Sequence, residues 1–150
     1  MCALFAFLHH AAAFALVAAL AVEFVLVRDD LTLRRARTVQ LADAAIGVSA
    51  AVVLVVGFLR VFYFEKGSAY YFHSAPFLSK IGLFVLIALL SIYPTVEFLS
   101  WSKVLRQGQV PVVSAGKLRT IRRIIHWELA GVVVLLLCAA LMARGAGYFG

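Results

Sequence analysis

The sequence predicts an all-α integral membrane protein, an antiparallel four-helix bundle with both termini on the outer, periplasmic side. Of the 150 residues, 65% are hydrophobic and 14% are charged, and the mean hydropathy is +1.03. Average soluble domains are only about half apolar and about a quarter charged. Each of four apolar runs reaches the ~20 residues that a helix needs to cross the hydrocarbon core. They cover residues 2–27, 41–64, 77–101 and 124–143. At this length we expect residues 1–150 to form a single transmembrane domain.

Basic residues gather in two of the three connections between these runs. The first connection holds Arg28, Arg34, Arg35 and Arg37, and the third holds Lys103, Arg106, Lys117, Arg119, Arg122 and Arg123. The second keeps only Lys66. Because cytoplasmic loops are rich in Lys and Arg, the first and third connections are predicted to be cytoplasmic. The net charge of +7 thus follows from topology, and no nucleic-acid partner is predicted. We expect a multi-pass protein of the bacterial inner membrane, with lipid around its spans and anionic headgroups at its cytoplasmic loops.

The first run, residues 2–27, is predicted as a retained helix and not as a signal peptide. It has no basic segment before it, and its apolar stretch exceeds the usual length of about 7–15 residues. Ala11, Ala15 and Ala19 form a stripe of small residues that allows close helix packing. Gly47 and Ala51 repeat this spacing in the second run. The stripes predict packing of the first helix against the second, with dimerisation as the alternative.

The middle of the chain carries turn and interface signals. Residues 65–68 form a predicted turn, and aromatic residues suited to a membrane–water interface flank it: Tyr63, Tyr70 and Tyr71. Pro76 suits the start of the third helix. Pro94 predicts a kink within that helix, because proline lacks the N–H that a helix needs. Residues 102–123 are predicted as a surface loop.

Motifs of soluble-enzyme chemistry are absent from the sequence. It has no P-loop, no Rossmann glycine pattern, no hydrolase triad and no zinc-ligand spacing. Cys2 and Cys138, the two cysteines, are interpreted as small hydrophobic residues, with a disulfide between them as the alternative. The sequence leaves open whether the protein is an enzyme.

Ionisable residues inside the runs sort into two layers when antiparallel helices are compared by depth. The outer layer holds His9, His10, Arg60 and Lys80, and the inner layer holds Glu23, Asp43, Glu97, His126 and Glu128. Such residues are rare in membrane spans and usually mark functional sites. The inner acids are expected to pair with cations of the cytoplasmic loops, with a proton path as the alternative. The two outer cations can instead extend to the headgroups.

The adjacent histidines of the first helix are the strongest indication of function. An imidazole can be an axial haem ligand, a proton relay or a copper ligand. Neighbouring residues on a helix point about 100° apart, so we expect only one of the pair to bind a given metal. His9 shares a helix face with Glu23, which favours an inward-facing His9. Copper or proton transport would use the same histidines.

Residues 57–101 read GFLRVFYFEKGSAYYFHSAPFLSKIGLFVLIALLSIYPTVEFLSW. This segment resembles a bacterial family of uncharacterised, predicted four-helix membrane proteins, and with the histidines and the basic third connection the likeness covers nearly the whole chain. More distantly, the chain is similar to HemJ-type and copper-resistance CopD-type proteins, which also begin with a histidine-bearing helix. The HemJ likeness implies bound haem b, with His10 or His9 as axial ligand. It also implies that Lys80 matches a third-helix lysine and that Arg60 lies near the propionates.

Two functions are therefore predicted. In the first, the protein binds b-type haem or porphyrin for electron transfer or porphyrin redox chemistry, through His9, His10, Arg60 and Lys80. In the second, it is a non-catalytic accessory subunit of a larger membrane complex, with other subunits or a second copy as partners. The sequence does not choose between the two histidines, and it specifies neither substrate, redox partner nor oligomeric state.

Overall fold

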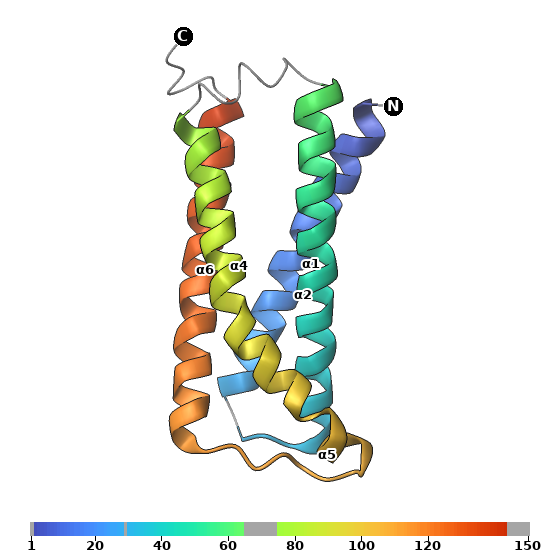
Figure 1. The fold of residues 1–150 in the computed structure, drawn as a ribbon, viewed down its shortest axis with the longest axis vertical. Coiled ribbons are helices and arrows are strands. Elements are labelled where there is room, and N and C mark those ends of the chain that lie inside the picture. The colour runs from blue at the N-terminus through green and yellow to red at the C-terminus, as the bar shows by residue number, and fades with distance from the viewer. Residues whose placement is uncertain (1, 29, 65–74, 144–150) are drawn as a thin grey trace.

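A computed structural model describes residues 2–28, 30–64 and 75–143. It contains four long helices, α1 (Cys2–Arg28), α2 (Leu33–Leu59), α4 (Ala75–Ser100) and α6 (Ala115–Ala143). Each includes a stretch long and apolar enough to cross a membrane. Figure 1 shows them running lengthwise, with the start of α1 and the end of α6 at the same end. The predicted all-α membrane bundle is confirmed, while the side of the membrane that the termini occupy stays a prediction.

Two helices begin ahead of the apolar runs, because polar side chains cap them. The Thr32 hydroxyl accepts a hydrogen bond from the Arg35 amide at 3.2 Å, so α2 begins at Leu33. The Ser114 hydroxyl accepts one from the Lys117 amide at 3.4 Å, just before the start of α6. The prediction of a loop over residues 102–123 was wrong in part, since the segment also contains the short helix α5 (Ser102–Arg106). Gly108, at φ 73°, follows α5 in a conformation that favours glycine.

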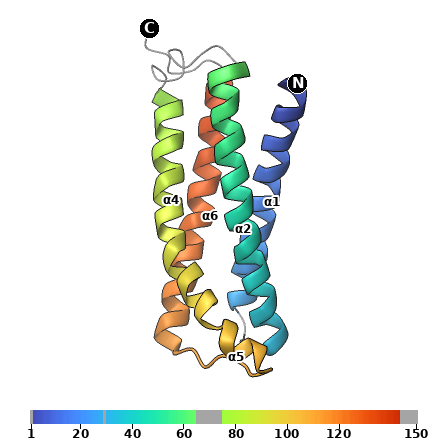
Figure 2. The ribbon, with the colours of Figure 1, turned by 45° about the vertical axis from the view of Figure 1, so that its right-hand side comes forward.

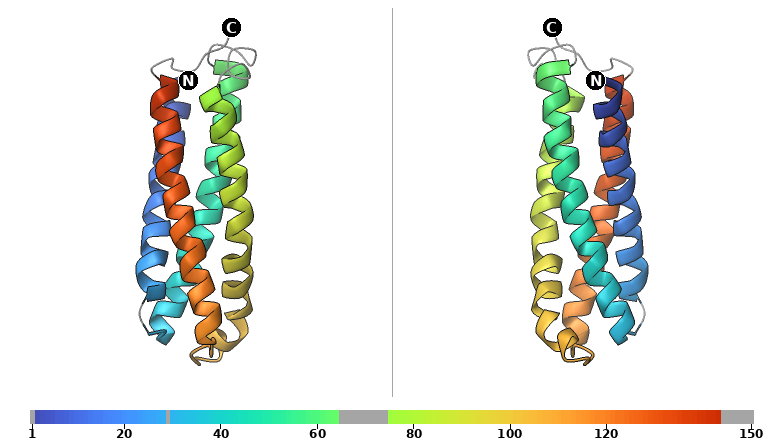
Figure 3. Two further views of the ribbon diagram at one scale, coloured as in Figure 1. Left: turned by 90° about the vertical axis from the view of Figure 1, so that its left-hand side faces the viewer. Right: turned by 90° about the vertical axis from the view of Figure 1, so that its right-hand side faces the viewer.

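The bundle is built from two helical hairpins. Helix α1 packs along α2, α4 packs along α6, and α1 also contacts α6, whereas α2 and α4 touch only sparsely. Figure 2 shows the order α4, α6, α2 and α1 across the bundle, and Figure 3 shows α4 and α6 nearer the viewer on its left and α1 and α2 nearer on its right. Figure 1 shows α2 and α4 lying apart at the end where α1 begins. The predicted packing of the first helix on the second is present, although Ala15 of the small-residue stripe is exposed.

Helix α4 changes partner along its length. Figure 1 shows its first half beside α6 and its second half crossing toward the base of α2. Buried Pro94 lies within the helix, where it removes one backbone donor and favours a bend. Gln40 then holds the second half of α4 to α2, because its amide donates to the Phe98 carbonyl and, at 3.0 Å, to the Ser102 hydroxyl.

The closest packing lies at the α5 end of the bundle. Phe98 and Trp101 stack edge to face, with ring centroids 4.9 Å apart, among buried aliphatic side chains from α1, α2 and α6. The Arg122 guanidinium donates to the Val27 carbonyl at 2.7 Å and satisfies a backbone acceptor at the end of α1. Toward the other end of the bundle, a cavity lies between the hairpins.

Several sequence predictions concern parts of the chain that the structure does not describe. These parts are the turn 65–68 with Lys66, the residues Tyr70 and Tyr71, and the side chains of Cys2 and Pro76. Tyr63 is described and is exposed, as expected for an aromatic residue at a membrane interface. Cys138 is a free, half-buried thiol.

Candidate functional site

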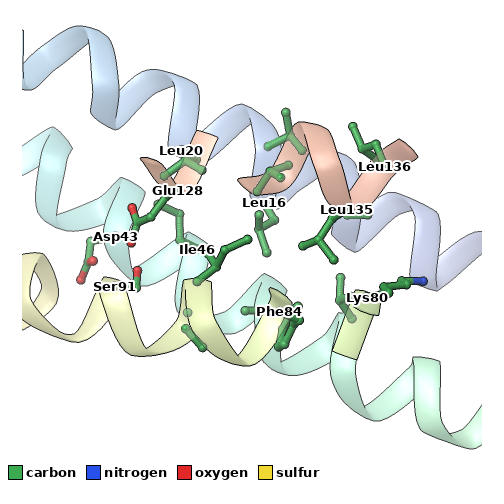
Figure 4. A pocket seen from close by; sticks show the side chains of 18 of the residues that line it. Leu16, Leu20, Asp43, Ile46, Lys80, Phe84, Ser91, Glu128, Leu135 and Leu136 are labelled. Atoms are coloured by element: carbon green, nitrogen blue, oxygen red, sulfur yellow. The ribbon is translucent and has the colours of Figure 1, made fainter. Parts of the chain in front are cut away.

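A cavity of about 560 Å³ lies between the two hairpins, and all four long helices line it. Its middle is apolar, and Figure 4 shows side chains from several helices facing one another across it. They include Leu16, Leu20, Ile46, Phe84 and Leu135. Pockets for small molecules and cofactors usually measure about 300–1,000 Å³ and are mostly apolar with a few polar groups. Both the size and the lining therefore suit a hydrophobic ligand with polar substituents.

One end of the cavity gathers the whole predicted outer layer: His9, His10, Arg60 and Lys80 all line it. Arg60 opens the π-helical segment η1 (Arg60–Phe64), which continues α2. Short π-helical turns are frequent at functional sites. The cationic groups of Arg60 and Lys80 lie close enough to the His9 ring to interact with it electrostatically. The structure thus brings together residues from three segments of the sequence.

The His9 ring is half-buried against the backbone of α2. A Cβ atom on Gly57 would lie 3.2 Å from His9 Cε1, so the glycine provides the space that the ring occupies. Nδ1 of His9 is buried and has no hydrogen-bond partner among the described residues. The sequence does not predict this role of Gly57, because nothing in the spacing of residues 9 and 57 indicates their contact.

The His10 ring is oriented by its own helix. Its Nδ1 donates to the Ala6 carbonyl at 2.6 Å, one turn earlier. The other ring nitrogen, Nε2, is then the one that can accept a proton or bind a metal, as in many metal-ligating histidines. The rings of His9 and His10 are nearly perpendicular, with centroids 5.9 Å apart. Although both residues line the cavity, their different orientations give them different chemistry.

The opposite end of the cavity is acidic. Asp43 and Glu128 line it, and Glu23 lies close enough to interact electrostatically with both. All three residues are buried: Asp43 is 8% exposed, Glu128 is 2% exposed and Glu23 is 1% exposed. The Thr95 hydroxyl donates to Asp43 Oδ1 at 2.7 Å, and Ser91 forms a hydrogen bond with the Glu128 side chain. The carboxyls of Glu23, Asp43 and Glu128 are called the acidic cluster below.

The expectation that inner acids pair with loop cations is met for only one of them. Lys117 Nζ lies 3.0 Å from Glu97 Oε2 at the bundle surface. For the acidic cluster the expectation was wrong, since no described cation pairs with it. Those side chains point into the bundle, away from the connections. His126, the histidine of the inner layer, is exposed and does not line the cavity.

The side chains of the described residues limit the metal ions that this site could hold. Among them, no three His, Cys, Asp or Glu side chains are grouped so that they could hold a metal ion. A haem iron needs fewer protein ligands, because the porphyrin supplies the equatorial nitrogens. A single imidazole of α1 can fill an axial position.

Fold and cavity define a multi-pass helical membrane protein with a polar-ended interior site. The chain belongs to the family described as predicted membrane protein (DUF2214), whose sequence model matches residues 1–147. This confirms the resemblance to a family of four-helix membrane proteins of unknown function. No curated protein and no solved structure matches the chain at a significant level. The likeness to HemJ-type and CopD-type proteins therefore stays a prediction.

Proposed function

We propose that the cavity binds b-type haem or a related porphyrin, with an imidazole of α1 as axial ligand. The observation that carries this proposal is the convergence of His9, His10, Arg60 and Lys80 on one apolar cavity. A porphyrin carboxylate needs cations, its macrocycle needs apolar walls, and its iron needs a nitrogen donor. The cavity offers all three.

His10 is the favoured axial ligand. Its Nδ1–H donates to the Ala6 carbonyl, which leaves the lone pair of the neutral ring on Nε2. His9 lies deeper, with its ring packed against Gly57 of α2. His10 would thus bind the iron, while His9 would contact the macrocycle or one of its substituents.

Arg60 and Lys80 are the residues that would hold the propionates. They approach the histidine end of the cavity from η1 and α4, respectively. Hydrogen bonds to charged groups contribute about 1.5–3 kcal/mol each. The apolar walls would exclude water from the macrocycle. When bound, haem supplies one-electron redox chemistry, and the chain positions it within the membrane.

Haem titration of purified protein, followed by Soret absorbance, tests this proposal. We expect saturable binding that His10→Ala weakens at least about tenfold, equivalent to ~1.4 kcal/mol. Arg60→Ala and Lys80→Ala should each weaken binding less severely. His126→Ala is the matched control, since His126 lies outside the cavity lining. Lack of saturable binding by the wild type, or wild-type binding by both His9→Ala and His10→Ala, would refute the proposal.

The second candidate is a non-catalytic subunit of a larger membrane complex or a homo-oligomer. Ala15 on α1 and Ala51 on α2 are exposed on the outside of the bundle, where small residues let another helix approach closely. Purification in a gentle detergent distinguishes the two candidates. An accessory subunit would co-purify with stoichiometric partners, and bulky substitutions at these alanines would release it. Migration only as a free monomer or homodimer in every mild detergent would contradict the accessory-subunit role.

A further inference from the structure

We propose that the acidic cluster at the inner end of the cavity is a proton-binding site, whose carboxyl groups are held in the neutral form and exchange protons with the cavity. This inference goes beyond the proposed haem binding and does not depend on it. It concerns the opposite end of the cavity, where Figure 4 shows Asp43, Ser91 and Glu128 close together and Lys80 far from them.

The acidic cluster draws its carboxyls from three of the four long helices. Glu23 comes from α1, Asp43 from α2 and Glu128 from α6, whereas α4 contributes only the uncharged hydroxyls of Ser91 and Thr95. The three carboxyls interact with one another electrostatically. Three like charges brought together inside a membrane protein, without a counter-ion, would be strongly unfavourable.

Neighbouring cations and histidines do not relieve this repulsion. On α6, Arg122 donates to the Val27 carbonyl. The exposed His126 ring has its centroid 6.3 Å from that of Phe24. Lys117 pairs with Glu97 outside the cluster. A buried carboxyl without a cation becomes neutral by taking up a proton.

An unpartnered oxygen at the cavity wall indicates where that proton is exchanged. Glu128 is 2% exposed and lines the cavity, yet its Oε1 has no hydrogen-bond partner among the described residues. Glu23 Oε2 is likewise buried and unpartnered, but Glu23 does not line the cavity. A neutral carboxyl can both donate and accept a hydrogen bond. Protons would therefore pass between the cavity and Asp43 or Glu128 first, and reach Glu23 through them.

Infrared spectroscopy of the haem-free, full-length protein in lipid vesicles tests this proposal. At pH 7 the wild type should show the C=O stretch of protonated carboxylic acids. Glu23→Gln, Asp43→Asn and Glu128→Gln should each weaken that band, because each substitution removes one carboxylic acid C=O group. Glu97→Gln is the matched control and should leave the band unchanged, since Glu97 is ion-paired with Lys117.

The wild-type spectrum decides the matter even if a variant does not fold. Absence of a protonated-carboxyl band at pH 7 would overturn the proposal, as would a band that persists undiminished in all three folded variants. Transfer to D2O adds the exchange order. The components assigned to Asp43 and Glu128 should shift before that of Glu23, and the reverse order would overturn exchange through the cavity. Because no haem is present, failure of haem binding leaves these outcomes unaffected.

Discussion

Gly57 is predicted to be coupled to His9, because the glycine provides the space for the imidazole. A Cβ at position 57 would lie 3.2 Å from His9 Cε1 and 3.6 Å from Nδ1, so Gly57→Ala requires the ring to shift by a few tenths of an ångström. Replacing glycine by alanine inside a helix contributes about 1 kcal/mol of stability through backbone propensity. Overpacking typically costs about 1–3 kcal/mol. In a chain that keeps His9, Gly57→Ala should therefore leave the free energy of unfolding unchanged or lower it.

A double-mutant cycle with His9→Ala isolates this contact. Without the imidazole, Gly57→Ala should stabilise the protein by about 1 kcal/mol. The coupling free energy between the two positions then equals the overpacking cost of about 1–3 kcal/mol. Chemical denaturation in detergent, followed by circular dichroism, measures the free energy of unfolding. Gly47→Ala, also on α2, is the matched control, since a Cβ there meets nothing within 4 Å. A coupling energy near zero would refute the contact between His9 and Gly57.

Three further predictions concern the packing and capping of the helices. Gly131→Ala should destabilise the bundle, because the new Cβ would lie 2.7 Å from Ile87 Cδ1. We expect chemical denaturation to show a free energy of unfolding lower by about 1 kcal/mol. Gly82→Ala is the control and should cause no loss, since a Cβ there meets nothing within 4 Å. Equal effects of the two substitutions would contradict close packing of α4 on α6. Thr32→Ala removes the α2 cap and should cost about 1 kcal/mol, with more rapid amide exchange in the first turn of α2; unchanged exchange would argue against the cap. Lys117→Ala should change the unfolding free energy by less than about 1 kcal/mol, because half of the Lys117 side chain is exposed to solvent; a larger loss would mean that the ion pair with Glu97 organises the connection.

The spans could be predicted from the sequence because bilayer thickness sets both their length and their apolarity. The helix starts were less predictable, because hydropathy does not detect polar first turns. Thr32 and Ser114 cap α2 and α6, so both helices begin before their apolar runs. Depth alone grouped His9 and His10 with Arg60 and Lys80, because antiparallel helices of similar length place such residues at one level. The structure puts these four residues on the wall of one cavity.

Other features depend on rotation and packing, which depth does not fix. Glu23 lies near the basic connections in sequence, yet its side chain is directed into the bundle, where Asp43 and Glu128 also lie. Nothing in the apolar run predicts a role for the hydroxyls of Ser91 and Thr95. Their hydrogen bonds to Glu128 and Asp43, respectively, follow from the rotation of α4. The contact of Gly57 with His9 arises only when α1 packs on α2.

The visible absorption spectrum of the protein purified from haem-supplemented cells tests the central claim most directly. If the cavity binds haem through an imidazole of α1, the wild type and His126→Ala will carry a Soret band, which His10→Ala will lose or shift. A colourless wild-type protein that is folded and helical by circular dichroism would contradict the claim.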